Sequence, residues 1–134
     1  MTDRTAGCLC GAVRLRISDM PSGFGACHCE MCRRWTGAAF LAVETPAAGV
    51  TVERGADRIA RYQSSGWAER AWCGTCGSHL WYRVTRAGHA GAGCHEIPLG
   101  LLDDPSGRDL LFMATGTGVA PFKSMIDYCF EQGW

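Results

Sequence analysis

The chain has 134 residues, of which 47% are hydrophobic and 19% are charged, a composition typical of one globular domain. Basic and acidic residues both number 13, so the formal net charge is zero, which argues against a generic nucleic-acid-binding protein. The first residues contain no apolar signal-peptide core, and no apolar run reaches the length of a membrane span. We therefore expect a cytoplasmic protein that binds neither membranes nor nucleic acids.

Short strands separated by glycine-rich turns are predicted along residues 12–84. In the first of them, Val13, Leu15 and Ile17 alternate with Arg14 and Arg16, which is the pattern of a half-buried strand. No convincing helical pattern occurs before residue 119, so this order predicts a mainly β fold with one C-terminal α-helix. The other predicted strands cover residues 38–43, 50–53, 59–62, 67–72 and 80–84.

Seven of the nine cysteines fall into tight groups, which is typical of metal binding in a reducing compartment. A C-x-C near the N-terminus contains Cys8 and Cys10, and a C-x-x-C in the middle of the chain contains Cys73 and Cys76. Together these two groups supply the four thiolates of a closed, structural zinc site. The spacing alone also allows a mixed arrangement of the cysteine groups. Disulfides or buried free thiols are the alternative to metal.

The third group, Cys27, Cys29 and Cys32, forms a C-x-C-x-x-C run. In an extended C-x-C the two cysteine side chains leave on the same face, while His28 leaves on the other. A turn through the next two residues then brings the third sulfur to the first two. Three thiolates leave one coordination position of zinc open, as a reactive site requires. Zinc is favoured over copper and over an iron–sulfur cluster, which takes four thiolates.

Five stretches of the sequence together resemble a known family. They are residues 7–14 (Gly-Cys-Leu-Cys-Gly-Ala-Val-Arg), 27–37 (Cys-His-Cys-Glu-Met-Cys-Arg-Arg-Trp-Thr-Gly), 61–65 (Arg-Tyr-Gln-Ser-Ser), 73–78 (Cys-Gly-Thr-Cys-Gly-Ser) and 98–105 (Pro-Leu-Gly-Leu-Leu-Asp-Asp-Pro). The family is that of the glutathione-dependent formaldehyde-activating enzymes, whose domain is shared with centromere protein V. The resemblance covers about residues 5–107, and three cysteine groups in this order make it specific.

The resemblance implies a β-tent-like fold of short antiparallel sheets around two zincs per chain. The family reaction joins glutathione and formaldehyde into S-hydroxymethylglutathione and is classed as a carbon–sulfur lyase reaction in the reverse sense. The expected partners are therefore glutathione and formaldehyde, or another small thiol adduct. The resemblance also implies that a structural zinc is held by Cys8, Cys10, Cys73 and Cys76, and that a second zinc, where glutathione acts, is held by Cys27, Cys29 and Cys32.

The chain departs from the family after residue 107. Residues 109–126 resemble the strand, phosphate-side loop and helix of a ferredoxin-NADP reductase type nucleotide-binding segment. In such a segment the nucleotide phosphates meet a helix N-terminus, but a glycine-rich loop out of context is a weak indication, and we expect no NADP binding. We divide the chain into a zinc domain at 1–107 and a strand-loop-helix tail at 108–134 that is not an independent domain.

An enzyme and a binding module are both compatible with these cysteines. In the enzyme, Arg33 and Arg34 pair with the carboxylates of glutathione, because guanidinium matches carboxylate bidentately; the alternative is that both are exposed structural charges. Trp35, three residues after Cys32, is expected near the second metal. The alternative function is a non-catalytic zinc module that binds glutathione or a protein partner. Residues expected to be core, surface or isolated side chains rather than ligands are His79, His89 and Cys94.

Overall fold

The structure is a computed structural model that describes residues 2–104 of the chain. In this part, two antiparallel sheets have the strand orders β1-β2-β5 and β3-β4-β9-β8-β7-β6. The mainly β, antiparallel class predicted from the sequence is confirmed. The strands are β1 (Thr2–Gly7), β2 (Arg14–Met20), β3 (Gly25–Cys27), β4 (Phe40–Pro46), β5 (Val50–Arg54), β6 (Ile59–Gln63), β7 (Ala68–Cys73), β8 (His79–Val84) and β9 (Cys94–Pro98).

An α-helix, α1 (Glu30–Thr36), lies where the sequence predicted only a turn, so the expectation of no helix before residue 119 was wrong. Its ends are well formed although it has only seven residues. Cys29 begins it as the N-cap, and Gly37 ends it in the left-handed conformation at φ 76°, which glycine adopts without a Cβ clash. The helix predicted after residue 119 lies outside the described residues, as does the tail at 108–134. Three short 3₁₀ helices are η1 (Ala47–Gly49), η2 (Ala56–Arg58) and η3 (Leu99–Leu101).

The hydrophobic core joins the two sheets. On β2, Leu15 and Ile17 are fully buried while Arg16 between them is exposed, as the alternation predicted. They belong to the same buried cluster as Leu80 of β8 and Ile97 of β9 in the second sheet. Burial of each such side chain contributes about 1.5–3 kcal/mol. The sequence pattern therefore identifies the sheet faces that hold the domain together.

Three strands, β1, β3 and β9, were not predicted from the sequence. In β1 the only buried side chain of residues 3–7 is Ala6, so no apolar alternation marks it. The strand β9 contains His95, Glu96 and Pro98, yet it lies between β4 and β8 inside the larger sheet. Its position depends on pairing with distant residues, which local patterns do not encode.

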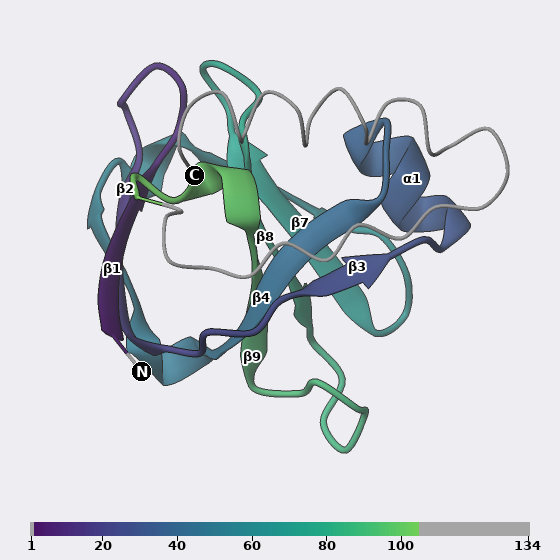
Figure 1. Ribbon diagram of the computed structural model, residues 1–134. Coiled ribbons are helices and arrows are strands. Elements are labelled where there is room, and N and C mark those ends of the chain that lie inside the picture. Colours follow the sequence, from purple (N-terminus) through teal and green to yellow (C-terminus); the bar gives the residue numbers. More distant parts are fainter. Residues whose placement is uncertain (1, 105–134) are drawn as a thin grey trace, which may run out of the picture.

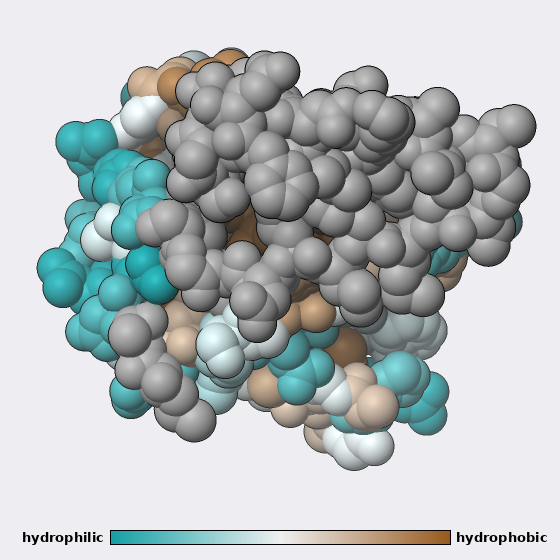
Figure 2. All heavy atoms as spheres, in the orientation of Figure 1, coloured by the Kyte–Doolittle hydropathy of each residue, from teal (hydrophilic) through white to brown (hydrophobic). Residues whose placement is uncertain are grey.

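The two sheets and α1 divide the molecule into distinct regions. Figure 1 shows β1 and β2 at one side and α1 at the opposite side, beyond β3 and β4. The outer surface over β1 and β2 is mainly hydrophilic (Figure 2). Arg16 of β2 and Glu53 of β5 form an exposed ion pair. Within residues 2–104, no helix has the length and apolar character that crossing a membrane demands.

Candidate functional site

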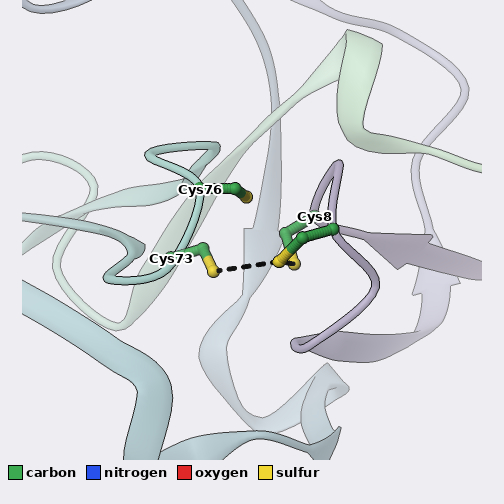
Figure 3. Close-up of side chains that lie close together, drawn as sticks. Cys8, Cys73 and Cys76 are labelled. Atoms are coloured by element: carbon green, nitrogen blue, oxygen red, sulfur yellow. Dashed lines mark hydrogen bonds between the residues drawn. The ribbon is translucent and has the colours of Figure 1, made fainter.

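Four cysteine sulfurs from two separate loops meet in one cluster. Cys8 and Cys10 follow β1, while Cys73 ends β7 and Cys76 lies three residues further on. All four Sγ atoms lie within 4.8 Å of one another. Figure 3 shows the sulfurs of Cys8, Cys73 and Cys76 pointing toward a common centre. The Sγ of Cys10 lies 3.5 Å from that of Cys8 and 3.9 Å from that of Cys73.

The hydroxyl of Ser78 links the two loops of this cluster. Its Oγ accepts a hydrogen bond from the backbone N–H of Leu9 at 3.0 Å and lies 3.2 Å from the Sγ of Cys76. Hydrogen bonds from the hydroxyl and then the backbone of Ser78, followed by the backbone of Cys10, lower the pKa of Cys76 to about 5, so its thiolate is favoured. The cluster thus joins the N-terminal loop to the end of β7 through sulfur and hydroxyl contacts.

The geometry of the four sulfurs fits a tetrahedral metal. Zinc–sulfur bonds of roughly 2.3 Å place the sulfurs of a tetrahedral site about 3.8 Å apart. The distances from the Sγ of Cys10 to those of Cys8 and Cys73, 3.5 and 3.9 Å, lie on either side of that value. Four thiolate donors complete the coordination, so this cluster has the character of a closed, structural metal site.

The second cluster is built where β3 meets α1. Cys27 is the last residue of β3 and pairs with Phe40 of β4, so its backbone is held in the larger sheet. Cys29 is the N-cap of α1, and Cys32 lies in the first turn of the helix. Their three Sγ atoms lie within 4.8 Å of one another. The structure therefore brings these seven cysteines together in the groups of four and three that the spacing favoured.

The three sulfurs of the second cluster have different surroundings. The backbone N–H of Cys32 donates a hydrogen bond to the Sγ of Cys29, and this lowers the pKa of the Cys29 thiol. Cys32 is only 4% exposed, and burial raises its pKa to about 12, while hydrogen bonds from Arg70 act in the opposite direction. An exposed sulfur and a buried sulfur therefore flank the same point, as expected of a site with one side open to a ligand.

A cavity of about 500 Å³ opens beside the three cysteines. This volume is within the range of small-molecule sites. The cysteine sulfurs form one part of its wall, and aromatic rings and two charged side chains form most of the rest. The lining residues are Gly25, Ala26, Cys27, Cys29, Met31, Cys32, Phe40, Ala42, Trp67, Arg70, Tyr82 and Glu96.

The cation in this cavity is Arg70, which the sequence reasoning did not single out. It lies on β7, is 3% exposed, and its two terminal nitrogens lie 3.7 and 3.6 Å from the Sγ of Cys32. Its guanidinium also lies over the rings of Trp35, at 4.8 Å, and Tyr82, at 5.1 Å. Arg70 is thus in direct contact with the second cluster.

The acid in this cavity is Glu96, at the centre of the larger sheet. It is paired across the strands with Glu44 of β4 and with Tyr82 of β8. Burial, and then the nearby Glu44 carboxylate, raise the pKa of Glu96 to about 6. Glu96 can therefore take up or release a proton near neutral pH at the wall of the cavity.

Arg33 and Arg34, predicted to bind substrate, lie on α1 but do not line the cysteine cavity. Both line a separate surface depression of about 460 Å³. Arg34 forms an exposed ion pair with Glu30, with 2.7 Å between the nitrogen and the oxygen. Their contact with a substrate stays a prediction.

Trp35, the third predicted substrate residue, packs beside the second cluster. It contacts the buried group that contains Cys32 and Phe40. Its other partner is the ring of His79, stacked at 4.1 Å with an interplanar angle of 17°. Burial lowers the pKa of His79, and the charge of Arg70 lowers it further, which favours a neutral, stacked ring.

His89 and Cys94, like His79, lie outside both cysteine clusters. The ring of His89 stacks on Trp67 at 4.6 Å, and His89 is exposed. Cys94 begins β9 and lines a smaller cavity of about 200 Å³ together with Glu44. Burial raises the pKa of the Cys94 thiol, and the neighbouring Glu44 raises it further. Among the described residues, none of these three side chains belongs to a group that could hold a metal ion.

One sequence feature could have pointed to Arg70. The apolar residues of the predicted strand at 67–72 are interrupted by two charges, and Arg70 shares the face of the buried Ala68. An arginine on the buried face, three residues before Cys73, indicates a charge that the interior must neutralise. No comparable pattern marks Tyr82 or Glu96, whose approach to the cysteines depends on the pairing of distant strands.

The chain is similar to a described protein family and to two named relatives. The family described as glutathione-dependent formaldehyde-activating enzyme matches residues 3–111 of the chain. A protein of Schizosaccharomyces pombe, named an uncharacterized lyase, is 32% identical over 85 residues, which are 63% of this chain and 61% of the relative. A protein of Halomonas elongata, provisionally named a glutathione-dependent formaldehyde-activating enzyme, is 36% identical over 81 residues, which are 55% of this chain and 52% of the relative. The chain thus spans little more than half the length of these relatives.

A solved structure shares the fold. The crystal structure of a Rhodobacter sphaeroides protein superimposes with a TM-score of 0.62 at 26% sequence identity. The match covers 74% of this chain and 87% of that protein. The fold of this chain is therefore similar to that of a protein whose crystal structure is known.

Proposed function

The chain belongs to the glutathione-dependent formaldehyde-activating enzyme family, and from this premise we propose that it is a carbon–sulfur lyase. Its reaction joins glutathione and formaldehyde into S-hydroxymethylglutathione, or forms a related adduct of a small thiol. The observation that carries this proposal is the cluster of Cys27, Cys29 and Cys32 at the wall of a cavity of about 500 Å³. Three sulfurs that converge beside an open cavity leave room for a fourth sulfur, that of the substrate.

We further propose that both cysteine clusters hold zinc. Cys8, Cys10, Cys73 and Cys76 would hold a structural ion, and Cys27, Cys29 and Cys32 would hold the reactive one. All donors are sulfur, which zinc accepts readily, and the first set is closed while the second is one ligand short. Zinc with an open position lowers the pKa of a thiol that occupies it, and this is the chemistry that the metal supplies.

The proposed reaction balances without an oxidant or reductant. The glutathione thiol loses its proton, a carbon–sulfur bond forms with the formaldehyde carbon, and the carbonyl oxygen takes up a proton. Glu96 lines the cavity and has a pKa raised to about 6, so we assign to it the transfer of this proton. The walls formed by Phe40, Trp67 and Tyr82 keep the two reactants together and limit water, which favours the bimolecular step.

Arg33 and Arg34 remain proposed partners of the glutathione carboxylates. They lie on the same short helix as Cys32, so a tripeptide whose thiol reaches the three cysteines would extend along α1. Arg34 must then exchange its exposed ion pair with Glu30, which contributes little, about 0.3–0.5 kcal/mol. Trp35 would support this arrangement by packing behind the cysteine cluster.

The proposal is tested by the rate of S-hydroxymethylglutathione formation, measured by exchange NMR with the zinc-loaded protein. We expect the wild type to exceed the rate in buffer, and Cys32→Ser to lose that acceleration. The matched control is Cys94→Ser, which removes a cysteine outside both clusters and should leave the rate unchanged. A wild-type rate equal to the rate in buffer would contradict the enzyme function and leave a zinc module that binds glutathione or a protein partner.

A further inference from the structure

Arg70 is a buried arginine that has no carboxylate partner among the residues that the structure describes. The residue is 3% exposed. Within residues 2–104, the ion pairs of the other arginines are made with aspartate or glutamate, whereas no carboxylate oxygen lies within 4.0 Å of the Arg70 guanidinium. The neighbouring Glu69 is already paired with Arg61 and Arg83. A buried guanidinium of this kind requires another source of negative charge.

Among the described residues, the guanidinium of Arg70 contacts a sulfur and two aromatic rings. Its terminal nitrogens lie 3.7 and 3.6 Å from the Sγ of Cys32, so both can donate hydrogen bonds to that atom. The rings of Trp35 and Tyr82 lie 4.8 and 5.1 Å from the guanidinium carbon. Aromatic faces attract a cation but do not neutralise it. They hold the guanidinium so that it faces the sulfur of Cys32.

The charge of the second cluster matches the charge of Arg70. Cys27, Cys29 and Cys32 bound as thiolates to one divalent cation carry one net negative charge. One guanidinium cancels that charge, which leaves a neutral assembly in a partly buried site. A further thiolate that enters the open position then meets a neutral assembly of metal, cysteines and guanidinium, so the charge of the three cysteines does not oppose its approach.

We propose that Arg70 is a positioning residue that supplies the counter-charge of the three-cysteine site. It thereby sets the affinity of that site for a divalent metal and for an incoming thiolate. The inference rests on the metal-binding part of the proposed function and on no step of the glutathione reaction. Among the described residues, the sulfurs of the four-cysteine cluster accept no hydrogen bond from an arginine, so the two sites should respond differently when Arg70 is changed.

The test is the zinc affinity of each site, measured on the whole chain by competition with a chromophoric chelator. Arg70→Met keeps the length of the side chain and removes its charge. We expect the second site to bind zinc about 10- to 100-fold more weakly, the range found for partners of metal ligands, and the first site to be unchanged. The matched control is Arg83→Met, on the neighbouring strand β8, whose partner is Glu69 and which should leave both affinities unchanged.

Two further measurements separate a charge effect from a packing effect. Arg70→Lys retains the positive charge, so the second site should keep its affinity to within about tenfold, and this variant serves if Arg70→Met does not fold. In the cobalt-loaded protein, the cysteines already give thiolate-to-cobalt charge-transfer absorption, and glutathione should increase it at a lower concentration with the wild type than with Arg70→Met. Wild-type affinity in Arg70→Met, or equal losses in the Met and Lys variants, would overturn the inference. A wild type that binds only one metal would instead overturn the proposed two-metal function itself.

Discussion

The Sγ of Cys29 accepts a hydrogen bond from the backbone N–H of Cys32 at 3.4 Å, so one sulfur both begins α1 and belongs to the second cluster. The helix N-cap and the three-cysteine cluster therefore share an atom. The first turn of α1 also sets the direction from which the Cys32 sulfur approaches. We therefore expect this short helix and the grouping of the three sulfurs to form together.

Substitutions of Cys29 should separate its two roles. Cys29→Ser replaces the sulfur with a hydroxyl oxygen that can still cap the helix, whereas Cys29→Ala leaves no side-chain atom that can cap it. We therefore expect the Ala variant to be less stable than the Ser variant by about 1 kcal/mol. Neither should bind the second metal. Urea unfolding of the two variants side by side measures this difference, with metal content determined on the same samples. Equal stabilities would show that the sulfur does not cap the helix in solution.

The four-cysteine cluster should carry much of the stability of the domain. Because structural zinc contributes several kcal/mol of folding free energy to small domains, we expect Cys76→Ser to lower the melting temperature by more than about 10 °C or to prevent folding. The hydroxyl of Ser78 would then lose its sulfur neighbour at 3.2 Å as well. Cys94→Ser is the control and should melt close to the wild type. A Cys76→Ser variant as stable as this control would exclude a structural metal at the cluster.

Gly55 holds the end of β5 against the loop that carries the first two cysteines. Its φ is 78°, and an added Cβ would overlap the carbonyl oxygen of Ala12. We therefore expect Gly55→Ala to destabilise the domain by about 2 kcal/mol or more. Gly66→Ala, at a site where an added Cβ meets no atom within 4 Å, is the control and should change stability by less than about 0.5 kcal/mol. Chemical denaturation of both variants measures these changes. A Gly55→Ala variant with nearly the wild-type free energy of unfolding would contradict the close packing of Gly55 on Ala12.

His95 should make stability fall on acidification. Burial, and then the charges of Arg83 and Arg61, lower the pKa of His95 to about 4, and its Nδ1 is buried without a hydrogen-bond partner. As pH falls below about 6.5, His95 takes up a proton in the unfolded chain before it does so in the folded protein. The contribution of neutral His95 to the free energy of unfolding is therefore complete above that pH and declines toward pH 4. After allowance for solvent screening of the partly buried ring, we expect a loss of about 1–2 kcal/mol between pH 7.5 and pH 5.

The variant His95→Gln provides the comparison for this pH dependence. Metal binding also weakens in acid, but it does so in both proteins and cancels in the difference. Urea unfolding at pH 7.5 and pH 5 should show a smaller acid-induced loss in His95→Gln than in the wild type. Identical losses would mean that another group accounts for the pH dependence.

Those parts of the site that depend on local sequence could be predicted. The spacings of Cys27, Cys29 and Cys32 place three sulfurs within reach of one another, whatever the rest of the fold does. The alternation of Leu15 and Ile17 with arginines likewise identifies the buried face of β2. In both cases the information lies within a few residues of chain.

The residues that complete the cavity could not be predicted in this way. Arg70 reaches Cys32 because β7 lies in the same sheet as β3 and β4, and the register of β7 against β8 shifts between Ala71 and Trp72. Glu96 enters through β9, whose sequence has no strand pattern and whose place depends on pairing with β4 and β8. The helix α1 was missed because its N-cap is a cysteine, which is not among the preferred capping residues.

The central claim is that the seven clustered cysteines form two separate metal sites and that glutathione needs only the second. Native mass spectrometry of the zinc-loaded chain under reducing conditions, with and without glutathione, tests it directly. We expect a wild-type chain with two zincs that gains one glutathione, and a folded Cys32→Ser chain with one zinc that gains none. A wild type with a single zinc, or glutathione bound to Cys32→Ser as tightly as to the wild type, would contradict it.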